Sequence, residues 1–102
     1  MIARIWKGLA HRVQVNKYLR HLEAETLELA AIEGFVRISV LQREMERGIE
    51  FLIMTVWQSE EAVKQFAGDM PTRAVVPQVI QDMMIEYDEY AAHYEIKSET
   101  YA

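Results

Sequence analysis

A nearly unbroken apolar segment, residues 51–57 (FLIMTVW), constrains the fold of this chain more than any other feature. A strand that is apolar at almost every position must be covered on both faces. The next residues predict a helix, because Ser59 is a favourable N-cap and Glu60 and Glu61 follow where the helix dipole favours negative charge. A buried strand that runs directly into a helix implies a sheet with helices on one face and a different cover on the other.

The length of the chain indicates what that second cover is. With 102 residues, the chain has room for one domain with one modest core. The helices of a single small domain are expected to cover only one sheet face. We therefore expect a second copy of the chain on the other face, which predicts a homodimer through the sheet faces, with two-fold symmetry.

Charge and composition exclude several classes of protein. The formal net charge is −5 and basic residues do not cluster, which argues against nucleic acid as a partner. No segment approaches the roughly 20 consecutive apolar residues of a membrane span. The first residues are too short and too polar a segment for a signal peptide, so the cytoplasm is the expected location. The chain has no cysteine, which excludes disulfides and thiol catalysis.

Hydrophobic periodicity predicts the order strand, helix, strand, strand, helix, strand. This order is typical of a ferredoxin-like α+β domain with an antiparallel four-stranded sheet. We expect one domain over residues 1–97 and a polar tail over 98–102. The predicted elements are a strand at 1–7 ending at Gly8, a helix at 12–32, strands at 35–43 and 51–57, a helix at 59–66 closed by Gly68, a loop at 69–77, a helical turn at 77–84 and a strand at 85–96.

Several short segments together carry a resemblance to a known family. They are residues 2–8 (IARIWKG), 33–35 (EGF), 55–59 (TVWQS), 66–69 (FAGD), 74–77 (AVVP) and 93–96 (HYEI). On these segments, the chain resembles the antibiotic biosynthesis monooxygenase superfamily, the dimeric α/β-barrel group, over nearly its whole length. The resemblance implies a ferredoxin-like monomer, a dimer with facing sheets, and a cavity between each sheet and its own helices. Some relatives oxygenate aromatic polyketides or quinols without metal, flavin or haem, and others degrade haem.

The haem-degrading branch can be compared with this chain residue by residue. Those relatives carry a catalytic Trp in the second helix and a haem-ligating His after it, and these positions fall here on Phe66 and Val76. They also use an Asn on the first strand, where this chain has Arg4, Ile5 and Trp6. Because a Val side chain cannot ligate iron, the resemblance does not extend to haem degradation.

Aromatic residues are the candidates for binding a planar ligand. Trp57 either forms a cavity wall that stacks on a substrate or packs beneath the helix that follows it, with its indole N–H donating to a backbone carbonyl. We expect Trp6, Phe66 and Tyr87 to shape the same cavity. The alternative for Tyr87 is a place in the dimer seam.

Arg4 and His93 are the candidate catalytic residues. Arg4 projects from an otherwise apolar strand, where it either stabilises a phenolate or enolate substrate or pairs with an internal carboxylate. The acids proposed as such partners are Glu86, Asp88 and Glu95.

His93 lies in the last predicted strand among tyrosines. The ordinary pKa of histidine, about 6.5, suits a general base for a hydroquinone, and the alternative is a hydrogen-bonded residue of the dimer interface. The chain offers no metal site, because His21 and Glu25 share a helix face but two ligands do not hold a metal.

These patterns lead to two functional hypotheses. The first is a cofactor-independent monooxygenase-like protein that acts on a small aromatic or quinol-type compound, with no cofactor. The second is a non-enzymatic dimeric module of the same fold that binds a small ligand or acts in a stress response.

Overall fold

The sheet is organised around its central strand, β1 (Ile2–Ala10), in the computed structural model, which describes residues 1–102. On one side β1 pairs with β3 (Ile49–Trp57), which pairs in turn with the edge strand β2 (Phe35–Glu44); on the other side β1 pairs with β4 (Met84–Tyr87) and β5 (Ala92–Glu95). All of these pairings are antiparallel. The remaining elements are the 3₁₀ turn η1 (Arg12–Gln14) and the helices α1 (Val15–Ala30), α2 (Glu60–Ala67) and α3 (Gln78–Gln81).

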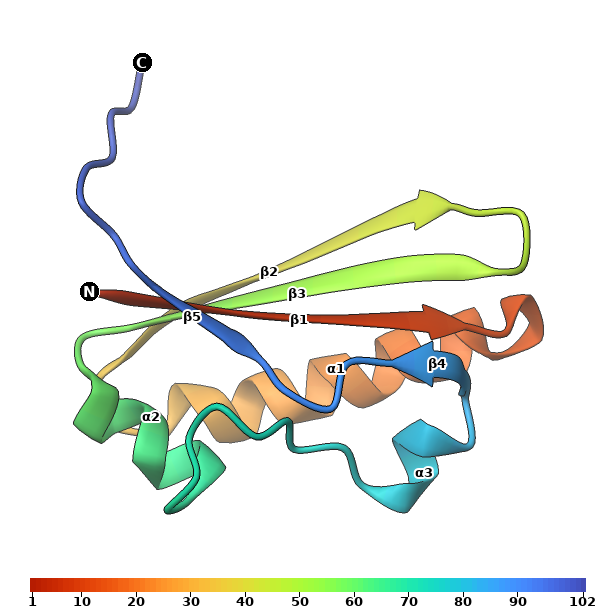
Figure 1. Ribbon diagram of the computed structural model, residues 1–102, viewed down its shortest axis with the longest axis horizontal. Coiled ribbons are helices and arrows are strands. Elements are labelled where there is room, and N and C mark those ends of the chain that lie inside the picture. The colour runs from red at the N-terminus through yellow and green to blue at the C-terminus, as the bar shows by residue number, and fades with distance from the viewer.

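The helices lie together on one side of the sheet, and the chain beyond β5 continues away from them (Figure 1). This arrangement confirms the predicted ferredoxin-like α+β fold. α2 begins as the sequence predicts, because the Ser59 hydroxyl accepts a hydrogen bond from the backbone N–H of Ala62 at 3.2 Å. It ends at Gly68, whose φ of +79° is the left-handed conformation that favours glycine.

The face of the sheet toward the helices carries the core. Around β3, Phe51 packs edge-on against Tyr18 of α1 with ring centroids 4.9 Å apart. At the other end of β3, Trp57 has no exposed surface and packs against Phe35 and Phe66. We call this the covered face. The opposite face, which we call the open face, has no helix over it.

The open face is apolar at its centre and charged around it. Strand pairing places Ile5 beside Met54 and Leu41 beside Leu52 on this face. Leu41 is 51 % exposed, and Tyr94 from β5 is 59 % exposed. The monomer therefore leaves uncovered the second face that the apolar sequence of β3 predicts to be buried.

The prediction of one continuous last strand over residues 85–96 is wrong. It is divided into β4 and β5, because Asp88 bonds to β1 through its backbone and its side chain instead of continuing the ladder. Its carbonyl accepts from the Trp6 indole N–H at 2.8 Å, and its carboxylate accepts from the Lys7 backbone N–H at 3.2 Å. The next residues then pair with the 68–77 loop, where the N–H of Ala91 donates to the carbonyl of Thr72 at 2.7 Å.

Two smaller boundaries also differ from the prediction. Gly8 does not end β1; a side chain there would collide with the Trp6 ring, 2.6 Å from a β-carbon, so the glycine makes room for that indole. The predicted helical turn at 77–84 is shorter, because α3 ends at Gln81 and Met84 already belongs to β4. α1, the longest helix, lacks the length and hydropathy to cross a membrane, and so do the others.

Candidate functional site

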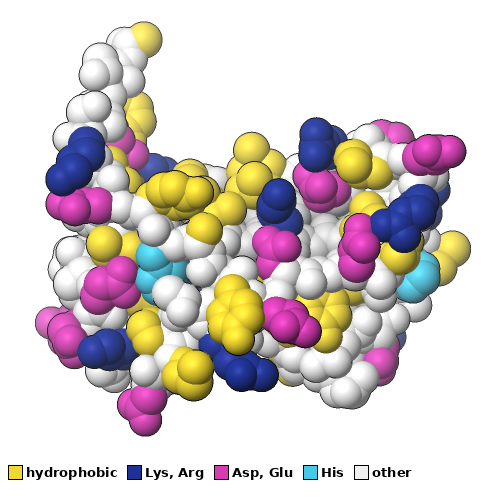
Figure 2. Space-filling model, in the orientation of Figure 1, with side chains coloured by type: hydrophobic (Ala, Val, Ile, Leu, Met, Phe, Trp, Pro, Cys, Tyr) yellow, Lys and Arg dark blue, Asp and Glu magenta, His cyan; other side chains and the backbone are white.

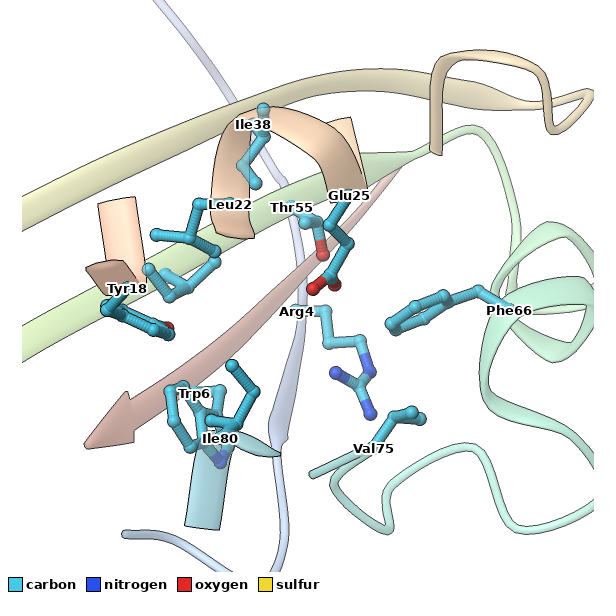
Figure 3. Close-up of a pocket in the computed structure, with 11 residues that line it drawn as sticks. Arg4, Trp6, Tyr18, Leu22, Glu25, Ile38, Thr55, Phe66, Val75 and Ile80 are labelled. Carbon is cyan, nitrogen blue, oxygen red and sulfur yellow. The ribbon is translucent and has the colours of Figure 1, made fainter. Parts of the chain in front are cut away.

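A small cavity of about 50 Å³ lies between the covered face and the helices (Figure 3). Most of its lining is apolar, and the sheet, α1, α2, α3 and the 68–77 loop all contribute to it. The lining residues are Arg4, Trp6, Tyr18, Leu22, Glu25, Ile38, Ile53, Thr55, Phe66, Val75 and Ile80. Arg4, Trp6 and Phe66 were predicted from the sequence as site residues, and the structure brings these three together.

Arg4 is the cation of this cavity, and only 6 % of it is exposed. Its Nη2 donates to the carbonyl of Arg73 at 3.0 Å and its Nε to the carbonyl of Pro71 at 3.4 Å, which ties the 68–77 loop to the sheet. Its guanidinium carbon lies 5.5 Å from the centre of the Phe66 ring, within cation–π distance. Burial lowers the pKa of Arg4, while the charges of Glu25 and Glu60 act against that shift, and the group remains a cation at neutral pH.

The predicted carboxylate partners of Arg4 are wrong. Glu86 pairs with Arg47, Glu95 pairs with Lys97, and the Asp88 carboxylate accepts from a backbone N–H. The physical reason is the division of the last strand, which aligns His93 rather than an acid with Arg4. Backbone carbonyls of the loop take the place of a carboxylate.

Two polar residues of the cavity, Tyr18 and Glu25, were not predicted as site residues. Both come from α1, and Figure 3 shows the Glu25 carboxylate directed toward the Arg4 side chain. Burial raises the pKa of Glu25, which the charge of His21 partly offsets. Burial also raises the pKa of Tyr18 well above its ordinary value. The available signal was spacing, because residues 18, 22 and 25 share one helix face and place a carboxylate on an apolar stripe.

A second hollow of about 240 Å³ lies immediately outside the cavity, since Glu25, Phe66 and Val75 line both. We call it the outer groove; its other lining residues are His21, Ala24, Glu28 and Pro77. The cavity alone is well below the roughly 300–1,000 Å³ of typical small-molecule sites. A ligand of one or two rings therefore needs the outer groove for most of its volume and the cavity for its polar end.

Trp57 and Tyr87 lie elsewhere. Trp57 stacks on Phe66 at 6.0 Å between ring centroids, and its indole N–H donates to the Thr55 hydroxyl at 2.9 Å rather than to a backbone carbonyl. It contacts residues that line the cavity without lining it itself. Tyr87 packs 6.5 Å from Trp6 and borders a separate groove between β1 and β4.

His93 sits beside Arg4 on the neighbouring strand but does not line the cavity. Its Nδ1 lies 3.1 Å from both carboxylate oxygens of Glu60 at the start of α2. Its Nε2 is buried and has no hydrogen-bond partner. On the face of the molecule that Figure 2 shows, in the same orientation as Figure 1, acidic and basic side chains are interspersed. No three His, Asp or Glu side chains converge to a metal-binding arrangement.

The fold places the protein among ferredoxin-like α+β proteins with a cavity between the sheet and the helices. The amino-acid sequence then shows its family. A family model described as antibiotic biosynthesis monooxygenase matches residues 6–76, well over half of the chain. The protein belongs to the antibiotic biosynthesis monooxygenase family. No curated protein sequence matches the chain.

Solved structures show the same fold. A Bacillus cereus protein assigned as an antibiotic biosynthesis monooxygenase is 25 % identical, with a TM-score of 0.70 over 99 % of this chain and 97 % of that one. A mutant of SnoaB, a cofactor-independent oxygenase from Streptomyces nogalater, is 12 % identical, with a TM-score of 0.70 over 96 % and 94 %. The haem degrader MhuD from Mycobacterium tuberculosis is 12 % identical, with a TM-score of 0.64 over 98 % and 99 %. At 12 % identity, the likeness to SnoaB and MhuD shows the fold alone.

Proposed function

We propose that the protein is a cofactor-independent monooxygenase of small phenol- or quinol-type aromatic compounds. The observation that carries the proposal is a buried cation, Arg4, that lines an otherwise mostly apolar cavity beside Phe66. A phenolate there gains far more from a positive charge than it would in water, because the surroundings have a low dielectric constant. Membership of the family and the activity named for SnoaB agree with this assignment.

The proposed reaction balances without an added reductant. A phenol with an unsubstituted para carbon loses its hydroxyl proton to give an anion that Arg4 stabilises. Electrons from the anion reduce dioxygen, one oxygen atom becomes a carbonyl at the para carbon, and the other leaves as water with the two hydrogens that the phenol gives up. The substrate therefore supplies all four electrons, and the product is a para-quinone.

The site residues of this proposal are those that border the space. Arg4 would hold the anion, while Trp6 and Phe66 would contact the ring. Trp57 would act as a positioning residue, because it stacks on Phe66 and holds the Thr55 hydroxyl. The Arg4 hydrogen bonds to the 68–77 loop would keep that loop over the cavity and limit the entry of water.

Oxygen uptake with 1-naphthol tests the activity. We expect one dioxygen consumed per 1,4-naphthoquinone formed, and one atom of label from ¹⁸O₂ in the product. Arg4→Gln should lower kcat/KM by roughly 10²-fold or more, the usual cost of removing a donor to a developing anion. Arg20→Gln, an exposed change on α1, is the matched control and should leave kcat/KM unchanged.

Two outcomes would contradict the proposal. Turnover by Arg4→Gln at the wild-type rate, with its fold intact by circular dichroism, would remove Arg4 from the reaction. Saturable binding of 1-naphthol without oxygen uptake would favour the alternative, a ligand-binding module that catalyses no reaction.

The open face supports a second part of the proposal, a homodimer. Its centre is apolar and includes Ile5, Leu52 and Met54, and ion pairs such as Arg43–Glu50 border it. An apolar centre with a charged rim is typical of a protein interface. A second copy related by a two-fold axis would cover this face in both molecules at once.

A further inference from the structure

We propose that Glu25 is the proton acceptor of this site, and that the ligand enters as a neutral hydroxyl compound which passes its proton to that carboxylate. The inference rests on the proposed function, because it assigns the base for the same ligand class. Neither the sequence patterns nor the family resemblance assigns a role to Glu25.

The placement of Glu25 is the first support. It lies on α1, on the wall opposite the sheet, and its carboxylate is directed toward Arg4 (Figure 3). The two side chains line the same cavity without a direct ion pair, and the ion pair that Glu25 does form is a long one to His21, 3.8 Å from Oε2 to Nε2. The second Nη of Arg4 is also free, since only Nε and Nη2 are bonded to the loop. A ligand hydroxyl between the two groups could donate its O–H to the Glu25 carboxylate, while its oxygen accepts from the Arg4 guanidinium.

The charge of the site is the second support. Without ligand, the cavity lining holds one cation, Arg4, and one anion, Glu25. A ligand that arrived as a phenolate would place two anions against one cation in a poorly solvated space, which is costly. When a neutral phenol gives its proton to the carboxylate, the O–H bond breaks, a carboxyl O–H bond forms, and the site again holds one cation and one anion. The negative charge has then moved onto the ligand oxygen beside Arg4.

The surroundings of Glu25 suit both uptake and release of this proton. The charged or titratable groups around it are His21 and Glu28 on α1, Arg4 on β1 and Tyr18 within the cavity. Burial raises the pKa of Glu25, so this carboxylate is a stronger base than an exposed one. Its side chain is 32 % exposed and lines the outer groove, so the proton can return to water after the reaction.

Tyr18 also lines the cavity, and its hydroxyl stays neutral. Burial and the charge of Glu25 raise the pKa of its phenol, so the hydroxyl stays protonated throughout the physiological range. It therefore cannot compete with Glu25 as a base. The ligand class that this set fits is a phenol or enol with the acidic hydroxyl at one end and an apolar ring at the other.

4-Nitrophenol is the probe, because its nitro group occupies the para carbon and blocks oxygenation while its anion is coloured. We would titrate it into the protein at a pH above the pKa of Glu25 and below that of the free probe. Absorbance gives the ionised fraction of the bound probe, and calorimetry in two buffers of different ionisation enthalpy counts the protons released. For the wild type, we expect ionisation of the bound probe without release of a proton to the buffer.

The variants identify the acceptor. Glu25→Gln keeps Arg4 but has no acceptor at this position, so the probe should still bind ionised and about one proton per probe should be released to the buffer. Glu25→Asp, which keeps a carboxylate, should take up part of the proton, so that fewer protons reach the buffer than with Glu25→Gln. Glu23→Gln is the matched control, since Glu23 is exposed on the same helix and lines neither the cavity nor the outer groove; we expect wild-type behaviour.

The opposite results would overturn the inference. They are wild-type protein that does not bind the probe, binds it as a neutral phenol, or releases a proton to the buffer on binding it. Binding of the ionised probe by Glu25→Gln without release of a proton would equally exclude Glu25. Proton release by His93→Gln, with none by Glu25→Gln, would make His93 the acceptor. Ionisation through Glu25 combined with no oxygen uptake on 1-naphthol would leave this inference standing and remove the oxygenase activity. The two proposals therefore fail in distinguishable ways.

Discussion

The covered face and the open face of one sheet differ in how their side chains are enclosed. On the covered face, Phe51 and Trp57 have no exposed surface, and the helices enclose both. On the open face, Leu41 and Tyr94 remain more than half exposed. Because β3 alternates between the two faces, its apolar sequence predicts two covers, and a single chain supplies one of them.

The two faces also place their charges differently. The open face carries exposed ion pairs such as Arg43–Glu50, which contribute little to stability. The covered face has few charged groups, and Arg4 and Glu25 both line its cavity. Burial of an ionic group costs free energy, so the rare charges of the covered face are the stronger indication of function.

The largest effect should come from removing the indole that fills the end of the covered face. Trp57→Ala should lower the free energy of unfolding by about 3–5 kcal/mol, because it leaves a cavity beside Phe35 and Phe66. Urea denaturation measures this. Leu27→Ala, on the exposed outer side of α1, is the control and should stay within about 0.5 kcal/mol. A loss below about 1 kcal/mol for Trp57→Ala would mean that this end of the covered face is not tightly packed.

A somewhat smaller effect should come from a charge at the centre of the open face. Met54→Glu should raise the Kd of the proposed dimer roughly 100-fold, about 2.7 kcal/mol, because a two-fold axis would bury two unpaired carboxylates. Sedimentation velocity over a concentration series measures it, with Leu27→Glu as the control for added charge. If wild-type protein sediments as a monomer at every concentration, a second copy does not cover this face. The open face is then either uncovered or covered by a different partner.

Sequence periodicity was enough to predict the fold, because strands and helices are specified locally. The run at 51–57 and the Ser59 cap are found in the structure where they are predicted. The break in the last strand was not predictable in this way, since it depends on the Trp6 indole and the Lys7 backbone reaching Asp88, some 80 residues away. Residues so distant in sequence leave no periodic signal.

The candidate site was predictable only in part, for a related reason. Arg4, Trp6 and Phe66 stand out as unusual side chains on their own elements, and they do line the cavity. Glu25 stands out only once α1 is seen to place it across from Arg4. An acidic residue in a helix rich in acidic residues is unremarkable until the register of that helix against the sheet is known.

The smallest effect should be on the pH dependence of stability. We expect the contributions of two carboxylates, one on each face, to have opposite signs. Burial raises the pKa of Glu25 above 4.5, so the folded state binds more protons than the unfolded one and stability falls as pH rises above that value. On the open face, the hydrogen bond from Arg43 lowers the pKa of Glu50 below 4.5, so stability is lost as pH falls below that value. Each carboxylate thus reports on its own face.

Replacement of each acid by its amide separates the two. Unfolding midpoints across the acidic and neutral range should show that Glu25→Gln loses the fall in stability above pH 4.5. Glu50→Gln should lose the stability that wild-type protein retains at neutral pH through the Arg43 pair. If both amides shift the profile in the same direction, the Glu25 carboxylate is as well solvated as Glu50. The covered face would then offer no environment in which Glu25 becomes a stronger base than an exposed acid.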